Sequence, residues 1–409
     1  MHFFKSPPRS LFLFFTLAIP FFLSAGDWPQ WRGPDRDGLS KESGLLQEWP
    51  EAGPKLAWKA SGLGEGYSSI AVSDGVIYTL GDFPDGAYIV AVREKDGSPV
   101  WKTKFGEAGG HKGYKGTRST PTVDGGQVFG MNQQSDVACV DAESGKLLWT
   151  VNLQKDFGGK MMSGWKYSES PLVDGDRVIV TPGGKQGTLL ALDRKTGEKV
   201  WQTEDWTDAA GYSSVVVATI HGKRQYVQLT GESVAGVDPD SGEVIWKAAR
   251  KGKTAVITTP VVQDDIVFVT SAYGVGCNAF RIAADGTAEE LYANKSISNH
   301  HGGVVLLDGY VYGGSGGTFR CLNIETGEEM FKERSAGKGA TLYADGLFYL
   351  RAEDGPMALI QASPGGYEEV SRFEQPHRSG QKAWAHPVIA NGKLYLRDQD
   401  ILLCYDIAK

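Results

Sequence analysis

Three of the seven histidines in this sequence, His300, His301 and His386, could take part in chemistry, because an imidazole can hold a metal, move a proton or bond a ligand. Arginine, glutamate, tyrosine and tryptophan side chains stand at matching places in other parts of the chain. The complete set of candidate ligand-binding residues is Arg118, Trp165, Glu169, Tyr212, His300, His301, Trp384 and His386. No catalytic residue can be named from this set.

Each residue type in this set suggests a particular interaction. Arg118 could hold an anionic ligand with two donors, or could pair with Glu169. Trp165 or Trp384 could stack on a planar ring. For the histidines we favour a structural or hydrogen-bonding role, with ligand binding and metal coordination as alternatives. No spacing typical of metal ligands supports a metal site.

A repeated motif predicts the elements that must bring these residues together. Leu189–Trp201 reads LLALDRKTGEKVW, and related copies are Ile89–Trp101, Val137–Trp149, Val234–Trp246 and Phe319–Phe331. The copies recur about every 40 to 50 residues, a period typical of a propeller or a solenoid. The final aromatic residue of each unit is a predicted structural blade anchor, and the tryptophan anchors are Trp58, Trp101, Trp149, Trp201 and Trp246.

Each unit predicts four short strands. Segments such as Ser170–Val180 (SPLVDGDRVIV) contain two apolar runs joined by an Asp-Gly or Asn-Gly type turn, which is a strong hairpin signal. The "ALD" run and the anchor strand then form a second hairpin around a Thr-Gly or Ser-Gly turn. Apolar residues recur at every second position, as in a strand, and not about every 3.6 residues, as in a helix, so the pattern argues against helical repeats. Four antiparallel strands per repeat make a propeller blade.

Eight first strands can be counted, so the predicted fold is an all-β, eight-bladed propeller. The last unit ends after three strands, and the segment Lys55–Ala60 (KLAWKA) carries a spare anchor at Trp58. We expect this N-terminal strand to complete the last blade, because an open ring would expose two strand edges. The domains expected are a signal peptide at 1–26, a lead-in segment at 27–54 and one propeller at 55–409.

First strands of a propeller line its channel, so the loops before them should form one rim. The candidate residues fall in these loops and should converge there although they are distant in sequence. Neighbouring residues on an extended strand point to opposite faces. At most one of His300 and His301 should therefore face the channel, unless the chain bends there.

The N-terminus predicts an exported protein. Lys5 and Arg9 precede an apolar stretch, Leu11–Leu23, that is short for a membrane span, and small residues follow at Ser24–Gly26. After cleavage no stable membrane span is expected, and the location should be periplasmic or extracellular. The formal net charge of −7 at pH 7 does not indicate a basic surface that would bind nucleic acid. We expect a monomer.

The four cysteines predict no disulfide. Cys139, Cys321 and Cys404 all occupy the place of Ala191 in the repeat, and equivalent positions of different blades lie far apart around a ring. They are expected to be small buried residues, since free cysteine behaves as a small hydrophobe. Cys277 lies two positions ahead of the aligned residue.

The unit A-L-D-x-x-T-G-E-x-x-W resembles the pyrroloquinoline-quinone (PQQ) repeat, and the resemblance covers about residues 55–409. The start of the mature chain, DWPQWRGPDRDG at 27–38, is similar to exported PQQ-like propellers of planctomycete type. More distant resemblances are to the propeller of the outer-membrane assembly lipoprotein and to quinoprotein dehydrogenases. The resemblance implies that the anchor tryptophans pack between neighbouring blades.

The resemblance leaves two main functions open. The first is a binding or interaction scaffold that uses its channel rim for a protein, peptide or small-molecule ligand. The alternative is a periplasmic PQQ-dependent oxidoreductase acting on alcohols or sugars. Quinoprotein dehydrogenases carry adjacent cysteines against the quinone and a set of calcium ligands, and neither motif is found in this sequence.

A third and weaker hypothesis is a lyase or hydrolase that uses His300 or His301 with Tyr212. The shape of the rim separates the small-molecule from the scaffold interpretation. A rim pocket with Arg118, Glu169, Trp384 and a histidine pointing inward would favour small-molecule binding, and a plugged or flat rim a scaffold.

Overall fold

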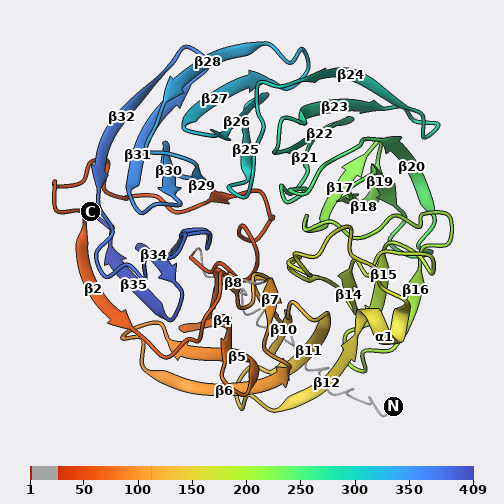
Figure 1. Cartoon of the computed structure of the whole chain (residues 1–409), viewed down its shortest axis with the longest axis horizontal. Coiled ribbons are helices and arrows are strands. Elements are labelled where there is room, and N and C mark those ends of the chain that lie inside the picture. The colour runs from red at the N-terminus through yellow and green to blue at the C-terminus, as the bar shows by residue number, and fades with distance from the viewer. Residues whose placement is uncertain (2–25, 112) are drawn as a thin grey trace.

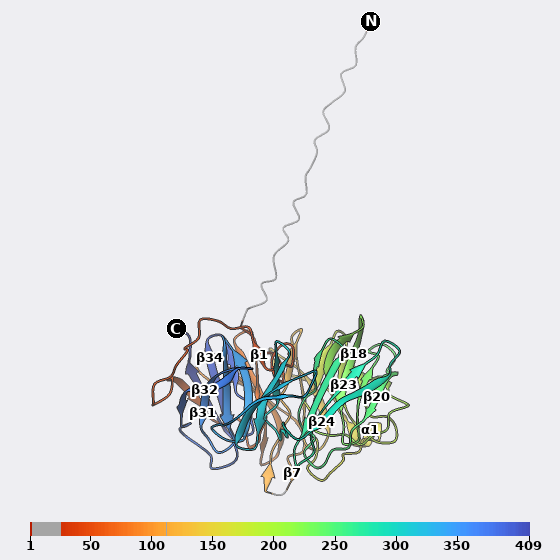
Figure 2. The ribbon, with the colours of Figure 1, turned by 90° about the horizontal axis from the view of Figure 1, so that it is seen from above.

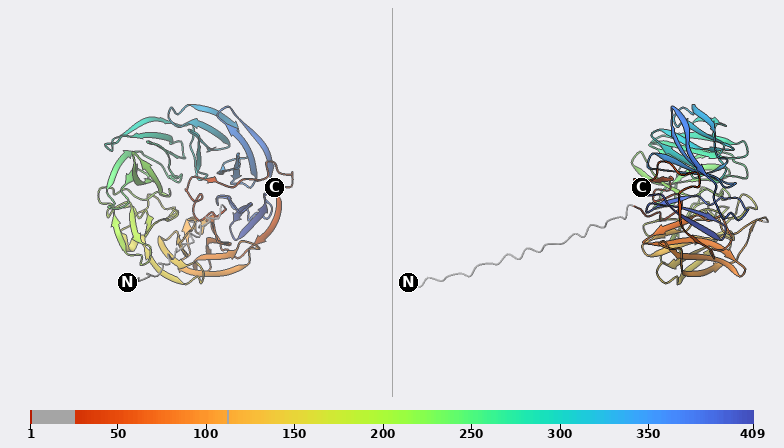
Figure 3. Two further views of the ribbon diagram at one scale, coloured as in Figure 1. Left: turned by 180° about the vertical axis from the view of Figure 1, so that it is seen from behind. Right: turned by 90° about the vertical axis from the view of Figure 1, so that its left-hand side faces the viewer.

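The structure is a computed structural model that describes Met1, residues 26–111 and residues 113–409. The predicted signal peptide lies almost entirely outside the described residues. Eight four-stranded antiparallel blades stand around a central channel, one of them extended by the short strand β1 (Leu39–Ser40), so the predicted eight-bladed propeller is confirmed (Figure 1). Seen edge-on, the blades form a thick disc (Figure 3). Among the described residues, no helix is long and apolar enough to cross a bilayer.

The first four blades run in sequence order, each from its inner to its outer strand. Blade I contains β3 (Ile70–Ser73), β4 (Val76–Phe83), β5 (Gly86–Arg93) and β6 (Pro99–Gly106). Blade II contains β9 (Thr122–Asp124), β10 (Gln127–Met131), β11 (Asp136–Asp141) and β12 (Leu147–Asn152), followed by α1 (Leu153–Phe157). Blade III contains β13 (Leu172–Asp174), β14 (Arg177–Val180), β15 (Leu190–Asp193) and β16 (Lys199–Gln202). Blade IV contains β17 (Val216–Ile220), β18 (Lys223–Leu229), β19 (Ser233–Val237) and β20 (Val244–Ala249).

The other four blades repeat this order. Blade V contains β21 (Val261–Gln263), β22 (Ile266–Ser271), β23 (Gly276–Ile282) and β24 (Ala288–Asn294). Blade VI contains β25 (Val304–Leu307), β26 (Tyr310–Ser315), β27 (Thr318–Asn323) and β28 (Glu329–Arg334). Blade VII contains β29 (Gly339–Ala344), β30 (Leu347–Ala352), β31 (Met357–Ser363) and β32 (Gly366–Phe373). Blade VIII contains β33 (Val388–Ala390), β34 (Lys393–Asp398) and β35 (Ile401–Asp406).

The N-terminal strand β2 (Lys55–Ala60) completes blade VIII, as predicted. It pairs with β35 in the sheet order β2-β35-β34-β33, and Trp58 lies opposite Cys404. The outer strand of the last blade therefore comes from the start of the chain, and strand pairing closes the ring without an open gap.

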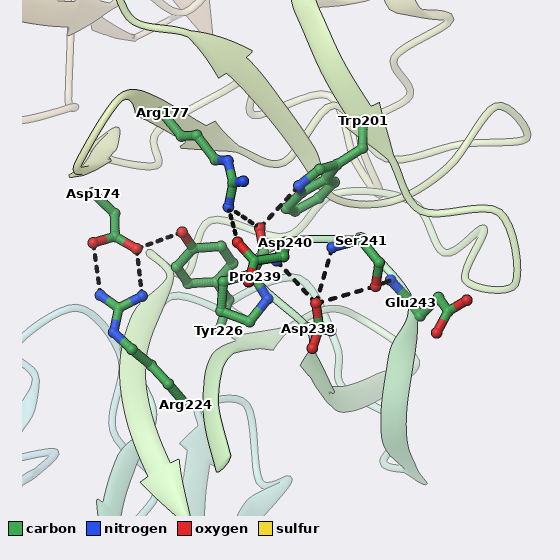
Figure 4. Close-up of polar contacts among 10 residues, drawn as sticks. All are labelled: Asp174, Arg177, Trp201, Arg224, Tyr226, Asp238, Pro239, Asp240, Ser241 and Glu243. Atoms are coloured by element: carbon green, nitrogen blue, oxygen red, sulfur yellow. Dashed lines mark hydrogen bonds and ion pairs between the residues drawn. The ribbon is translucent and has the colours of Figure 1, made fainter.

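An aromatic anchor fastens each of several blades to the next one. The indole N–H groups of Trp58, Trp101, Trp149 and Trp201 donate to backbone carbonyls 2.8–3.1 Å away in the following blade. Figure 4 shows this contact for Trp201, whose Nε1 donates to the carbonyl of Pro239 in blade IV. The implied packing of anchors between blades is thus present at these four positions.

The glycine of the repeated turn lies under the anchor of the preceding blade. A Cβ built on Gly242 would meet the Trp201 ring at 2.6 Å, and Gly97, Gly145 and Gly197 lie in the same way against Trp58, Trp101 and Trp149. Gly242 also has φ +78°, a backbone conformation that favours glycine. The motif glycine is therefore required both by the turn and by the indole that covers it.

Trp246 departs from this pattern, because it donates to the side-chain oxygen of Gln225 in its own blade. The position opposite Trp246 in the sheet is Gly236, and a Cβ there would meet the indole nitrogen at 2.2 Å. In blade V the anchor is Tyr292, whose hydroxyl donates to the carbonyl of Ile324 in blade VI.

Small residues stand opposite the anchors, which explains the cysteines. Cys139 pairs in register with Trp149, Cys321 with Phe331 and Cys404 with Trp58. Ala191 pairs with Trp201 in the same way. All four cysteines are buried and free, so the predicted absence of disulfides among them is confirmed.

The lead-in segment runs inside the ring, which the sequence does not predict (Figure 1). Its Trp28 exchanges two backbone hydrogen bonds with Val72 of blade I, and its strand β1 (Leu39–Ser40) pairs in parallel with β29 of blade VII. Between these ends, the buried Arg36 donates to the carbonyls of Ser170 and Pro171 in blade III. We call residues 27–40 the channel segment.

The anchor contacts predict different costs for two glycine substitutions. Gly75→Ala and Gly242→Ala both place a side chain at a similar positive φ, +74° and +78°, but nothing lies within 4 Å of a Cβ at Gly75. Gly75→Ala should cost about 1 kcal/mol, and Gly242→Ala roughly 1–3 kcal/mol more because the new methyl group presses on Trp201. Thermal unfolding of both variants measures the difference, and equal midpoints would contradict this role of the glycine.

Candidate functional site

A cavity of about 450 Å³ lies at one mouth of the channel. Its wall includes residues from the segments that precede the first strands of all eight blades, which is the predicted rim. One residue from each blade in order is Tyr67, Arg118, Ser168, Tyr212, Ile257, His300, Lys338 and Trp384. A hairpin of β7 (Gly110–His111) and β8 (Tyr114–Lys115) projects beyond the blades on one face, and Tyr114 contributes to the same wall (Figure 2).

Seven of the eight candidate residues line this cavity, and Glu169 is the one that does not. The seven are Arg118, Trp165, Tyr212, His300, His301, Trp384 and His386. Their convergence follows from the equivalent positions that they occupy in different blades. Their ligand-binding role remains a prediction.

Glu169 is buried behind the wall and bonds within the fold. Its carboxyl oxygens accept from the backbone N–H and the hydroxyl of Thr181 at 2.7 and 2.9 Å. Burial raises the pKa of Glu169 to about 8, although the bonds from Thr181 and the charge of Arg36 oppose this shift. No bond joins Glu169 to Arg118, so their suggested pairing is wrong.

Arg118 is held at the wall by backbone carbonyls and not by an acid. Its two terminal nitrogens donate to the carbonyls of Trp165 and Tyr114 at 2.6 and 2.8 Å. The guanidinium also lies 5.7 Å from the centre of the Trp165 ring. Burial lowers the pKa of Arg118 to about 10, so the group is still charged at neutral pH.

Both His300 and His301 reach the cavity because the chain bends at this point and is not an extended strand. The exception allowed in the sequence argument therefore applies. Burial, with the nearby His301 and Lys338, lowers the pKa of His300 to about 4. Burial also lowers the pKa of His301. Both imidazoles are consequently neutral at pH 7.

Glu353 is the centre of a polar cluster in the wall. Its carboxylate accepts from His301 Nε2 and Trp384 Nε1, both at 2.9 Å, and pairs with Lys338 at 3.0 Å. Burial acts to raise the pKa of Glu353, but the donors from His301, Trp384 and Lys338 outweigh it and hold the pKa below its usual range. Because Glu353 is an acceptor, His301 carries its proton on Nε2.

The inner end of the cavity is formed with the help of the channel segment. Trp31 lies against His386 with ring centres 4.3 Å apart, and its Nε1 donates to the hydroxyl of Thr259 at 2.9 Å. His386 bonds through Nε2 to the carbonyl of His301 at 2.8 Å. Burial and the charge of Arg32 lower the pKa of His386 to about 3. The cavity is therefore bounded by the channel segment on its inner side.

Aromatic rings make up much of the wall. Tyr114 stacks on Trp384 with an interplanar angle of 24°, and the ring centres are 4.8 Å apart. The ring centres of Tyr67 and Trp384 are also 4.8 Å apart, and those of Tyr114 and Trp165 are 5.7 Å apart. Tyr273 stands at the rim with φ +59°, a strained conformation for an aromatic residue.

Five wall residues are not predicted from the sequence: Trp31, Tyr114, Tyr273, Lys338 and Glu353. Trp31 lies in the lead-in, and Tyr114 in a hairpin that interrupts the repeat. Glu353 and Tyr273 follow second strands, whereas the alignment of the repeats compared only the segments before the first strands. A comparison of the loops between second and third strands would have been the signal for these last two.

The cavity residues do not fit a PQQ group held with calcium. Calcium takes six to eight oxygen ligands. Of the described wall residues only Glu353 carries a carboxylate, and its oxygens already bond His301, Trp384 and Lys338. Within the described part of the chain, no cluster of three or more histidine, cysteine, aspartate or glutamate residues could hold a metal ion.

Glu169 predicts a pH-dependent stability. Its pKa is about 8 in the folded protein against an ordinary value of 4.5, so folding takes up a proton. The stabilisation is complete below about pH 4.5 and is lost as pH rises to about 8, at up to about 1.4 kcal/mol per pH unit. Glu169→Gln should remove this loss. Thermal midpoints at about pH 5 and pH 8 test it, and an equal effect of the variant at both would contradict the assignment.

A family model described as outer membrane protein assembly factor BamB matches residues 85–333. BamB of Burkholderia pseudomallei is 29% identical over 206 residues, which cover 47% of this chain and 47% of that protein. Quinoprotein ethanol dehydrogenase of Pseudomonas aeruginosa is 28% identical over 161 residues, covering 36% of this chain and 25% of the dehydrogenase. The chain thus spans about half, or less, of the length of these curated relatives.

Solved structures with the same fold include members of both groups. BamB from Moraxella catarrhalis superposes with a TM-score of 0.57 at 17% identity, covering 80% of this chain and 93% of that one. Quinohemoprotein alcohol dehydrogenase from Comamonas testosteroni superposes with a TM-score of 0.64 at 12% identity, covering 94% of this chain and 81% of that one. At these identities the likeness shows the fold alone.

Proposed function

Because this chain belongs to the PQQ-like propeller family whose matching model is described as outer membrane protein assembly factor BamB, we propose that it is an exported, non-catalytic binding protein. It holds a small ring-shaped ligand in the cavity at one mouth of its channel. The leader-like N-terminus and the names of the relatives support export. The whole mature chain acts as one binding scaffold.

The observation that carries this proposal is the cavity itself. Its volume of about 450 Å³ is typical of small-molecule sites, which are concave, mostly apolar and equipped with a few polar groups. Trp384 and Tyr114 offer ring faces, while Arg118 and the Glu353 cluster offer polar contacts. With the channel segment on its inner side, the cavity suits a ligand that enters from one face.

The neutral histidines favour binding over proton-transfer chemistry. His301 is oriented by Glu353, as the base of a catalytic triad would be, but a nucleophile within bonding distance is needed as well. Among the described residues no serine, threonine or cysteine side chain bonds to the imidazole ring of His300, His301 or His386; the hydroxyl of Ser69 donates only to the backbone carbonyl of His386. The lyase or hydrolase hypothesis therefore has the least support.

A PQQ-dependent oxidoreductase remains the second candidate, and the similarity to quinoprotein ethanol dehydrogenase is what favours it. The stacked rings of the cavity could cover a flat quinone. Against it stand the lack of adjacent cysteines in the sequence and the single, fully bonded carboxylate of the wall.

Substitution of Trp384 tests the proposal. Ligand-observed NMR with a panel of small ring compounds should give saturation-transfer signals with the natural protein. Trp384→Ala should weaken binding about fivefold or more, because a stacked aromatic residue contributes at least ~1 kcal/mol. Trp384→Phe, which keeps a ring, should retain part of it, and Leu148→Ser, on the outer strand of blade II, serves as the control.

Two outcomes would contradict the proposed function. One is that signals persist unchanged in Trp384→Ala, which would place binding elsewhere. The other is that protein supplied with PQQ and Ca²⁺ oxidises ethanol or glucose with a dye as electron acceptor, which would establish the oxidoreductase.

A further inference from the structure

Resting on the proposed function, we infer that the cavity selects an anionic ligand: a small ring compound whose carboxylate, or an equivalent acidic group, is bound by Arg118. The ring lies against Trp384 and Tyr114. The class includes aromatic carboxylic acids and acidic sugars, which share a ring face and one negative charge.

The first step of the argument is that Arg118 has no counter-ion. Its guanidinium donates to the carbonyls of Trp165 and Tyr114, and among the described residues it takes part in no salt bridge. A partly buried cation without an anion is unfavourable, because its desolvation is not offset by a partner charge. A bound anion would supply that charge.

The second step is that both lysines of the wall have carboxylate partners, whereas Arg118 has none. Lys338 and Lys382 both pair with Glu353, at 3.0 and 3.5 Å, and Lys382 also pairs with Asp354. Asp354 is exposed and does not line the cavity, so the wall itself carries three cations and one carboxylate. The neutral histidines add no charge at pH 7. The wall is therefore net positive, and Arg118 is its cation without a carboxylate partner.

The third step is that Arg118 is equipped to hold an acid. Each of its terminal nitrogens carries two N–H groups and uses one on a carbonyl, so each keeps a second donor. Two such donors match the two oxygens of a carboxylate. Because those carbonyls fix the guanidinium, little side-chain entropy is lost on binding.

The surroundings of Arg118 add donors and a platform, and no competing acid. Tyr67 and Tyr212 lie near enough for their hydroxyls to interact with the guanidinium charge, and burial raises the pKa of both, so they stay protonated. Tyr114, whose carbonyl bonds Arg118, stacks on Trp384. An acid at Arg118 thus has a ring platform beside it.

Calorimetry with matched acid and neutral ligands tests the inference. The aromatic pair is 4-hydroxybenzoate with 4-hydroxybenzamide, and the sugar pair is D-galacturonate with D-galactose. In at least one pair the acid should bind about tenfold more tightly than its neutral partner, because its charge is paired in a desolvated site. The pair that shows the preference identifies the aromatic or the sugar source.

Variants then assign the preference to Arg118. Arg118→Gln should abolish the advantage of the acid, and Arg118→Lys should keep part of it. Arg224→Gln is the matched control, because Arg224 does not line the cavity and pairs with Asp174 between blades IV and III. If Arg118→Gln does not fold, the salt dependence of binding to the natural protein is the test. Raising NaCl from about 50 mM to about 500 mM should weaken binding of the acid several-fold and leave binding of the neutral compound unchanged.

The outcomes separate this inference from the proposed function. Neutral partners that bind as tightly as the acids, or an acid preference that survives in Arg118→Gln, would overturn the inference while the binding function stands. Failure of every acid and every neutral ring to bind the natural protein would overturn both.

Discussion

The channel segment, residues 27–40, is the contact on which the rest of this structure depends. The inner strands of a propeller leave backbone groups directed at the channel, and buried groups of this kind need partners. Trp28 bonds Val72 in blade I, Pro29 accepts from Val123 in blade II, and Gly38 accepts from Tyr343 in blade VII. Arg32 and Arg36 reach carbonyls in blades VI and III. One short segment thereby joins the inner edges of five blades and bounds the cavity.

At the circumference, a different contact keeps neighbouring blades in place. Each indole from Trp58 to Trp201 bonds the repeated turn of the next blade and lies over its glycine. The small residue opposite each anchor, alanine or cysteine, leaves room for the ring. The motif thus recurs along the sequence because its copies make the same packing contact between neighbouring blades. It fixes where every first strand begins, and therefore where the rim residues converge.

What could be predicted from the sequence is what the repeat determines. The eight blades, the closure by β2, the free cysteines and the convergence of Arg118, Tyr212, His300 and Trp384 all follow from aligned positions. The channel segment could not be predicted, because its strand is two residues long and its contacts exist only once the ring has formed. Glu169 shares the alignment, yet its side chain turns to Thr181, and such a choice is made by local packing. Glu353 follows a second strand, outside the first-strand positions that were aligned, and Tyr114 lies in a hairpin that interrupts the repeat.

These contacts together form a cavity with one open side, an aromatic wall and one cation without a carboxylate partner, Arg118. The central claim is that this cavity holds a small ring-shaped acid. A crystal structure of the protein soaked with the tighter-binding acid tests it most directly. We predict density for one molecule in the cavity, its ring against Trp384 and its carboxylate within hydrogen-bonding distance of the Arg118 guanidinium. An empty cavity in crystals saturated with that acid, or the acid bound on the outer surface of the blades, would contradict the account.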